Sequence, residues 1–366
     1  MTSSVQIPAA FRLVGTTLPN DWQVVSPLNW ELDANTGLPL GDGYGSGGNF
    51  GIPYVVQRKE RKAFLKAITL HRLKGRGDII QAMREVTDVV EFEREIHRVC
   101  ADHRMDRVVQ AVDGGQVSLG QNIEDQVPYI IMELADGDVR RRLRKIEEAQ
   151  IIAWKMRAMH HAAVGLSQLH GQRIAHQDLK PSNLMSFDAE SGFKLGDFGR
   201  SVRQGVAAPH EDFNHAGDPS YAPPELMYGE LDPDWVRRRV GCDIYMLGGL
   251  LSWAFLGEAA TPLLVQRLAP THRPLVARGQ WVGTYRDVLP FVRSSFTDLV
   301  SDFETAVPEW LREKLVPAFV QLTEPDPQLR GHPLERKSKH GSQFSLTRYI
   351  SLFNTLAATA KLNAKA

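Results

Sequence analysis

The sequence predicts an α+β protein in two parts, a small strand-rich region with one helix and then a larger, mostly helical region. Short apolar segments rich in β-branched and aromatic residues are typical of strands, and four of them lie at residues 52–57, 63–70, 108–113 and 127–134. Residues 78–100 instead carry apolar side chains every three or four positions, which predicts a helix. Helical patterns return at 149–170 and from 223 onward, so the boundary between the two parts falls near residues 134–139.

The composition is that of an ordinary globular protein, with 43% hydrophobic and 23% charged residues. Lys plus Arg and Asp plus Glu both number 43, so the formal net charge is zero. This balance argues against an extended surface for nucleic acid or membrane, although it leaves room for a local basic patch. Cys100 and Cys242 make no disulfide framework, and we find no secretory signal or bilayer-spanning apolar run. We therefore expect a cytoplasmic protein.

The residues that carry chemistry are concentrated in one short segment and in a tripeptide that follows it. Residues 176–183 read HQDLKPSN, and Asp197-Phe198-Gly199 begins fourteen residues after Asn183. Two carboxylates and an amide carbonyl provide the hard oxygen ligands that Mg²⁺ prefers and shares with phosphate. A lysine beside them is suited to neutralising charge on a transferring phosphoryl group. Together the two motifs predict a phosphoryl-transfer site.

These motifs resemble the catalytic and magnesium-binding loops of the protein kinase family. The resemblance spans about residues 41–335. It implies a two-lobed protein-kinase-like fold, with a small β-rich N-lobe that has one key helix, a larger mostly helical C-lobe, and ATP between the lobes. It also implies that Asp178 orients the substrate hydroxyl and accepts its proton, while Lys180 contacts the γ-phosphate. Asn183 and Asp197 would hold Mg²⁺, and the substrate would be a protein with Ser or Thr acceptors.

A glycine-rich stretch resembles the family loop that covers the phosphates of ATP. Only glycine lets backbone N–H groups approach phosphates that closely. The resemblance assigns this role to Gly47, Gly48, Phe50 and Gly51.

Lys66 lies fifteen residues after Gly51 and resembles the strand lysine that contacts the α- and β-phosphates. In the family this lysine pairs with a glutamate on the following helix, and Glu95 is the expected partner. Glu91 lies one helical turn earlier on the same face, whereas Glu93 is expected to point elsewhere.

Residues 129–138 resemble the last N-lobe strand and the hinge to the C-lobe. Met132 would sit at the back of the adenine pocket, and Asp138 would reach toward the ribose. The main chain would hydrogen-bond adenine through Glu133, Leu134 and Ala135.

Three C-lobe positions resemble structural landmarks of protein kinases. Glu225 ends the activation segment, Asp243 would brace the catalytic loop, and Arg330 would pair with Glu225. Small-molecule kinases of related fold usually lack these landmarks, so a protein substrate is favoured. The alternatives are a pseudokinase that acts as a nucleotide-binding scaffold, and a small-molecule phosphotransferase of the aminoglycoside or choline type.

Three other positions depart from the family pattern. Gln177 stands where an arginine usually pairs with a phosphorylated activation loop, so we expect activity without loop phosphorylation. Asp218 replaces a threonine that faces the catalytic aspartate, and it would compete for the catalytic lysine or raise the pKa of Asp178. Phe64 replaces a small alanine above adenine, and strand alternation places it on the same face as Lys66.

The chain is accordingly divided into a lead-in over residues 1–40 that packs on the small lobe, an N-lobe over 41–134, a C-lobe over 135–335 and a helical tail over 336–366. The run Arg237-Arg238-Arg239 is interpreted as a solvated surface that could dock an acidic substrate, rather than as a nucleic-acid patch.

Overall fold

The structure is a computed structural model of the chain, and it describes residues 7–33, 39–40, 51–70, 79–188, 192–215, 217–337 and 342–364. The chain divides into two compact units. Unit 1 combines Met1–Arg104 with Val109–Ala135, and unit 2 combines Met105–Val108 with Asp136–Ala366. The first unit is rich in strands and the second in helices, as the sequence predicts.

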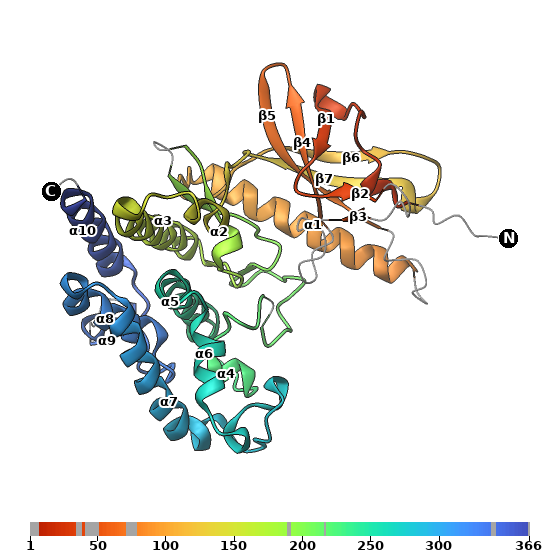
Figure 1. The fold of residues 1–366 in the computed structure, drawn as a ribbon. Helices are drawn as coiled ribbons and strands as arrows, with labels where there is room; N and C mark the ends of the chain where they lie inside the picture. Colours follow the sequence, from red (N-terminus) through yellow and green to blue (C-terminus); the bar gives the residue numbers. More distant parts are fainter. Residues whose placement is uncertain are drawn as a thin grey trace. The chain divides into compact units, whose positions relative to one another are not determined.

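Unit 1 is built on a five-stranded antiparallel sheet with the strand order β1-β4-β5-β7-β6 (Figure 1). The hairpin over residues 51–68 and β7 confirm three of the strand predictions, whereas the strand expected at 108–113 begins later, at Ala111, and runs to Ser118. A separate short pair is formed by β2, Glu31–Leu32, and β3, Pro39–Leu40. The strands of the main sheet are β1 Gln23–Pro27, β4 Gly51–Arg58, β5 Arg61–Ile68, β6 Ala111–Ser118 and β7 Gln126–Met132.

The N-terminal segment supplies a large part of the hydrophobic core of unit 1. Trp22 is fully buried in the same cluster as Tyr54 and Leu65, which lie on one face of the sheet. Two hydrogen bonds fix the segment to β4: the Tyr54 hydroxyl donates to Ala10 O at 2.7 Å, and Trp30 Nε1 donates to Pro53 O at 2.7 Å. Residues 7–33 therefore contribute both a strand and core side chains to this unit.

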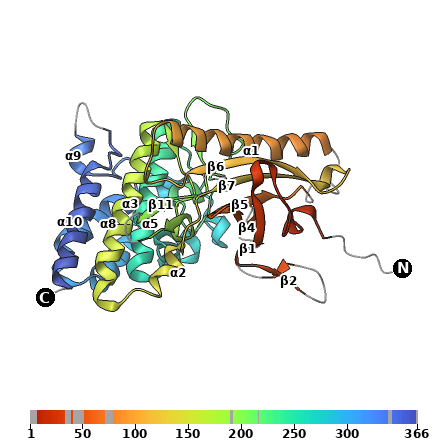
Figure 2. The same ribbon diagram turned by 90° about the horizontal axis from the view of Figure 1, so that it is seen from above.

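The helix expected over residues 78–100 is α1, Ile79–Asp102, and it runs beside the sheet (Figure 2). Its buried side chains follow a spacing of three or four residues, which is the stripe that a helix presents to one neighbour. One member of this stripe, Glu93, is acidic. The buried residues of the stripe are Val86, Val90, Glu93, His97 and Cys100.

Unit 2 is organised around α3, Ile151–Gly171, and α5, Gly241–Leu256. Nearly every residue of α5 is buried, which confirms the core helix that its apolar sequence predicts. The other helices are α2 Val139–Leu143, α4 Pro224–Met227, α6 Ala260–Arg267, α7 Tyr285–Ala306, α8 Glu309–Thr323, α9 Pro333–Arg336 and α10 Thr347–Asn363. Short strands complete the unit: β8 Gly137–Asp138, β9 Ile174–Ala175, β10 Leu184–Ser186, β11 Phe193–Leu195 and β12 Val202–Arg203.

The last helix, α10, packs along α3 within unit 2 (Figures 1 and 2). A hydrogen-bonding contact of 3.0 Å joins His160 Nδ1 on α3 to the main-chain oxygen of Ile350 on α10. In the described part of the chain no single helix is both long and apolar enough to cross a membrane, and only the bent pair Val236–Leu256 and Ala260–Arg267, at 79°, meets that test when taken together.

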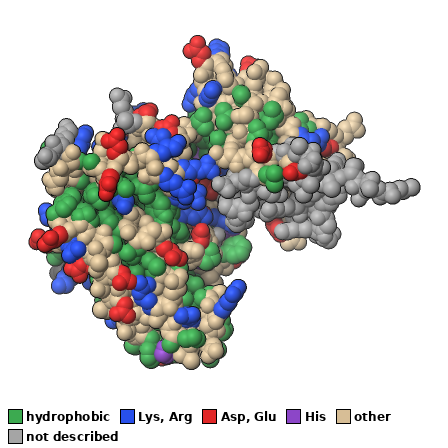
Figure 3. Space-filling model, in the orientation of Figure 1, with side chains coloured by type: hydrophobic (Ala, Val, Ile, Leu, Met, Phe, Trp, Pro, Cys, Tyr) green, Lys and Arg blue, Asp and Glu red, His purple; other side chains and the backbone are tan. Residues whose placement is uncertain are grey.

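Although the net charge is zero, Lys and Arg side chains gather over α2 on the face shown in Figure 3. Asp138 partly balances them, because its carboxylate lies 3.0 Å from the guanidinium of Arg140. The basic side chains of α2 and of the turn after it are Arg140, Arg141, Arg142, Arg144 and Lys145.

Candidate active site

A buried carboxylate on α5 sets the main chain of the catalytic loop. Asp243 has no exposed surface and accepts hydrogen bonds from His176 N at 2.7 Å, Gln177 N at 2.8 Å and His170 Nε2 at 2.9 Å. Burial acts to raise the pKa of Asp243, but the hydrogen bonds from His170 and Gln177 outweigh it, and the pKa lies below its usual value. Gln177 adopts a φ of +64°, a left-handed conformation that is costly for a side-chain-bearing residue. Asp243 therefore braces the loop, as expected.

The loop brings Asp178 and its polar neighbours together. Lys180 Nζ lies 3.1 Å from Asp178 Oδ2, and Asn183 Nδ2 donates to the same oxygen at 3.0 Å. The other carboxylate oxygen accepts the main-chain N–H of Asp218 at 2.8 Å. Asp178 is only 4% exposed, so these contacts fix its carboxylate.

Asp218 competes with Asp178 for Lys180 as expected, because its carboxylate lies 3.6 Å from Lys180 Nζ. Burial and then the charge of Asp197 raise the pKa of Asp178, against the opposing effects of Lys180 and of the Asp218 N–H. Of the two effects expected of Asp218, the structure thus shows the competition for Lys180, while the main-chain N–H of Asp218 acts to lower the pKa of Asp178.

The expected magnesium ligands offer oxygen donors of the right kind. The Asn183 amide nitrogen is used on Asp178, where it also donates to the main-chain oxygen at 2.8 Å. The side-chain oxygen of Asn183 accepts from Ser182 Oγ at 3.3 Å and is the atom that would face a metal ion. Asp197 lies close enough to influence the pKa of Asp178. Among the described residues no cluster of three or more His, Cys, Asp or Glu side chains forms a metal cage. Mg²⁺ is usually held by one or two protein oxygen ligands, and phosphate and water oxygens fill the remaining coordination positions.

In unit 1, the partner of Lys66 is Glu93. Lys66 Nζ lies 2.8 and 3.0 Å from the two carboxylate oxygens of Glu93, and the two side chains are 12% and 2% exposed. The choice of Glu95 from the sequence is wrong. Glu95 accepts from Arg98 Nε at 2.9 Å on the outer face of α1, because the stripe that packs inward passes through Val90, Glu93 and His97.

Strand register places several residues on the face that carries Lys66. Phe64 and Lys66 alternate with buried Ala63 and Leu65, so they share a face as predicted. Pro53 pairs across the hairpin with Lys66, which assigns Pro53 rather than Tyr54 to this face.

Of the glycine-rich loop, the structure describes only its last residue. A Cβ at Gly51 would lie 2.8 Å from Cγ of Lys66, so glycine is required for the lysine side chain to pass there. The other three residues assigned to the loop lie outside the described residues: Gly47, Gly48 and Phe50.

The residues expected to contact adenine, Met132 to Ala135, are the last residues of unit 1. Met132 is buried opposite Phe64 in the sheet. Glu133 exchanges two hydrogen bonds of 3.0 Å with Gln110, one through its main-chain N–H and one through its carboxylate, so this N–H is not available to adenine. Leu134 and Ala135 are partly exposed.

Asp138, which was assigned to the ribose, caps a helix in unit 2. Its carboxylate accepts the main-chain N–H groups of Arg140 at 2.9 Å and Arg141 at 3.2 Å, and thus begins α2. Such an N-cap stabilises a helix by about 1 kcal/mol.

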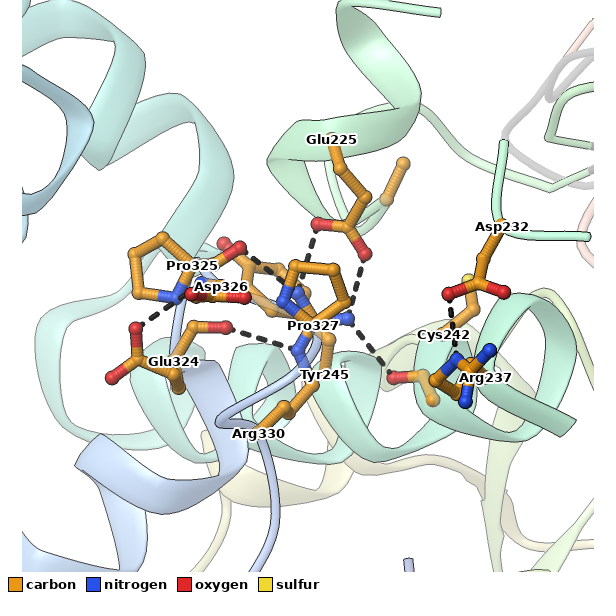
Figure 4. Close-up of polar contacts among 12 residues, drawn as sticks. Glu225, Asp232, Arg237, Cys242, Tyr245, Glu324, Pro325, Asp326, Pro327 and Arg330 are labelled. Carbon is orange, nitrogen blue, oxygen red and sulfur yellow. Dashed lines mark hydrogen bonds and ion pairs between the residues drawn. The ribbon is translucent and has the colours of Figure 1, made fainter. Parts of the chain in front are cut away.

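Further along unit 2, the expected landmark pair is present and buried (Figure 4). The guanidinium of Arg330 donates to both carboxylate oxygens of Glu225, at 2.7 and 2.8 Å, and has no exposed surface. Arg330 also donates to Glu324 O at 3.0 Å and lies 4.9 Å from the ring centroid of Tyr245. A bidentate pair of this kind holds the end of the activation segment against the start of α5.

A pocket of 390 Å³ opens beside this pair. Its lining comes from α4, the turn after it, Arg237 and Arg238, α7 and the segment before Arg330, and it includes no residue of the catalytic loop. It therefore lies apart from the chemistry described above.

Three features are typical of two-lobed protein kinases: a lysine–glutamate pair, a buried aspartate with Lys and Asn beside it, and a buried Glu–Arg pair. A family model of the protein kinase domain matches residues 47–263, more than half of the chain, and the chain belongs to this family.

Several named relatives are similar to the chain. Cell division control protein 2 homolog 3 of Trypanosoma brucei brucei is 29% identical over 172 residues, covering 44% of this chain and 53% of that protein. Serine/threonine-protein kinase crk1 of Schizosaccharomyces pombe is 29% identical over 188 residues, covering 50% and 48%. Probable serine/threonine-protein kinase PknB of Bifidobacterium longum is 28% identical over 192 residues, covering 51% and 27%. The chain thus spans about half or less of the length of these relatives.

Proposed function

We propose that the chain is a protein kinase that transfers the γ-phosphoryl group of ATP to Ser or Thr hydroxyls of a protein. The observation that carries the proposal is the buried Asp178 carboxylate with Lys180 at 3.1 Å and Asn183 at 3.0 Å. Two of the similar proteins are named serine/threonine-protein kinases, which supports the class of acceptor.

The residues of unit 2 would carry out the transfer. The acceptor oxygen forms a bond to the γ-phosphorus, the bond from that phosphorus to the bridging oxygen breaks, and ADP leaves. Asp178 would orient the acceptor hydroxyl and take up its proton, and a raised pKa makes its carboxylate a better acceptor for that proton. Lys180 would neutralise charge on the γ-phosphoryl group.

Asn183 and Asp197 would hold Mg²⁺, which supplies neutralisation of phosphate charge when it is bound. In unit 1, Lys66 would contact the α- and β-phosphates while Glu93 fixes its ammonium group. Positioning and electrostatics, rather than a covalent intermediate, account for such a reaction.

The test compares the wild type with Asp178→Asn and with a matched control, Asp298→Asn, which removes a carboxylate from an exposed position on α7. Phosphate transfer to Ser/Thr peptides is measured by ADP release and peptide mass. We expect Asp178→Asn to lose at least about 100-fold in kcat, the size of a general-base contribution, while the control keeps wild-type activity.

Other results would overturn the proposal in specific ways. A wild type that binds nucleotide but transfers nothing would be a pseudokinase scaffold. ADP release that depends on an aminoglycoside or choline, and not on peptides, would indicate a small-molecule phosphotransferase.

A further inference from the structure

The segment that precedes α5 carries three consecutive arginines in different surroundings. Val236–Val240 form a single π-helical turn, a feature that is frequent at functional sites. Arg237 pairs with Asp232 at 2.7 Å, whereas Arg239 has no exposed surface. The interpretation of the run as a solvated surface is therefore wrong for Arg239.

The guanidinium of Arg239 joins two segments that are far apart in the sequence. One terminal nitrogen donates to the main-chain oxygen of Glu211 at 2.6 Å and to that of Phe213 at 3.3 Å. The other donates to the side-chain oxygen of Gln177 at 3.3 Å, and the Gln177 amide donates back to Arg239 O at 2.8 Å. Because Gln177 immediately precedes Asp178, Arg239 connects the activation segment to the catalytic loop.

The carboxylate of Glu211 supplies negative charge at this junction. Its Oε1 lies 3.1 Å from Arg238 and 3.9 Å from Arg239. Burial acts to lower the pKa of Arg239, and the carboxylates of Glu211 and Asp243 act in the opposite direction. A guanidinium this deeply buried needs such partners, since an unpaired buried charge is strongly destabilising. We call Glu211, Arg238 and Arg239 the Glu211 clamp.

The sequence around Glu211 offers little for phosphorylation to act on. Residues 202–219 contain no Ser, Thr or Tyr, and the exposed Ser220 lies nine residues after Glu211, outside the clamp. Ser201, just before them, is fully buried, and its hydroxyl donates to His176 O at 3.3 Å. The negative charge that meets Arg238 and Arg239 is thus a genetically encoded carboxylate.

We propose that the Glu211 clamp holds the activation segment on the catalytic loop without phosphorylation, so that the kinase is competent as synthesised. Arg239 is then a positioning residue, because it acts on Asp178 through Gln177 and touches no reacting atom. This inference rests on the proposed kinase activity and concerns the regulation of the same site.

The experiment uses the full chain, first treated with phosphatase until its intact mass shows no phosphate. This protein is expected to keep its kcat within about twofold. Glu211→Gln removes the charge but keeps the shape, and Asp212→Asn removes the same charge from the exposed neighbour as a matched control. We expect Glu211→Gln to lower kcat about tenfold, within the usual range of coupling between two sites, with an unchanged KM for ATP. Asp212→Asn should match the wild type.

A second variant and a second readout keep the test decisive. Arg239→Lys retains the charge, but its single nitrogen cannot replace both terminal guanidinium nitrogens, one of which faces Gln177 and the other the two carbonyl oxygens, so it should also lower kcat. Hydrogen exchange of the amides in residues 205–215 should become about tenfold faster in Glu211→Gln than in Asp212→Asn.

Loss of activity on phosphatase treatment would overturn the inference, and so would a Glu211→Gln variant that equals Asp212→Asn in both kcat and exchange. If the wild type transfers no phosphate at all, the proposed function fails. The exchange comparison then decides by itself whether the clamp holds the segment.

Discussion

The partner of Lys66 can be tested by mutation, because the sequence predicts Glu95 whereas the structure shows Glu93. Replacing Glu93 by Gln leaves one neutral oxygen to accept from the ammonium group, in place of two carboxylate oxygens at 2.8 and 3.0 Å. Hydrogen bonds to charged groups contribute about 1.5–3 kcal/mol, and breaking a buried pair costs about 3–5 kcal/mol. Because Lys66 keeps 12% exposure, water relieves part of that cost, and we expect a loss of about 2–3 kcal/mol.

Glu95→Gln is the matched control on the same helix. The Glu95 carboxylate is 35% exposed and pairs with Arg98 three residues later, a contact worth at most about 0.5 kcal/mol. Its removal should change the free energy of unfolding by no more than that amount.

Two measurements check this prediction. Urea denaturation gives the free energy of unfolding of each variant, a readout that does not depend on activity. ADP release at varied ATP gives kcat/KM, which should fall about 30- to 150-fold in Glu93→Gln if the same 2–3 kcal/mol is lost from the transition state, since about 1.4 kcal/mol corresponds to a factor of ten. Equal losses in the two variants, or a larger loss in Glu95→Gln, would refute the assignment of Glu93.

Three further perturbations have defined outcomes. Gly51→Ala should raise the KM for ATP roughly tenfold, because its Cβ would displace Lys66 from its path; an unchanged KM would contradict the close approach. Glu225→Gln leaves the fully buried guanidinium of Arg330 without its carboxylate and should cost about 3–5 kcal/mol in urea denaturation, whereas a loss below about 1 kcal/mol would argue against the buried pair. Burial and then nearby arginines lower the pKa of His161 to about 3, so below about pH 6.5 the unfolded chain takes up a proton that the folded chain refuses. The contribution of His161 to stability should therefore decrease by about 1.4 kcal/mol per pH unit as the pH falls from about 6.5 toward 3, and His161→Gln should have a shallower dependence on pH than the wild type by about that slope.

The catalytic loop could be predicted from the sequence because its chemistry depends on local spacing. Asp178, Lys180 and Asn183 lie within six consecutive positions, so the fold has little freedom to separate them. The strands and α1 were also predictable, since their apolar periodicity is a local property of the chain.

The partner of Lys66 could not be predicted so directly from the sequence. Which glutamate faces the sheet depends on the rotation of α1 about its axis, and packing in the whole unit sets that rotation. A signal was nevertheless present: Glu93 lies three residues after Val90 and seven before Cys100, so it continues the stripe of buried side chains. An acidic residue within an apolar stripe indicates a buried ion pair.

The environment of Arg239 was beyond sequence reasoning for a different reason. Runs of arginine are usually solvated, and burial of the third member depends on contacts with Glu211 and Gln177, which lie 28 and 62 residues away. Only the tertiary fold brings these groups together.

The N-terminal strand β1 determines where a fragment of this protein can begin and still fold. The family match begins at residue 47, whereas β1 and much of the core of unit 1 lie before it. A fragment that begins at residue 47 would leave β4, which carries buried Ile52, Tyr54 and Val56, as an unpaired edge of the sheet. Unpaired apolar edges add strands from neighbouring molecules, so such a fragment would aggregate even with every catalytic residue intact.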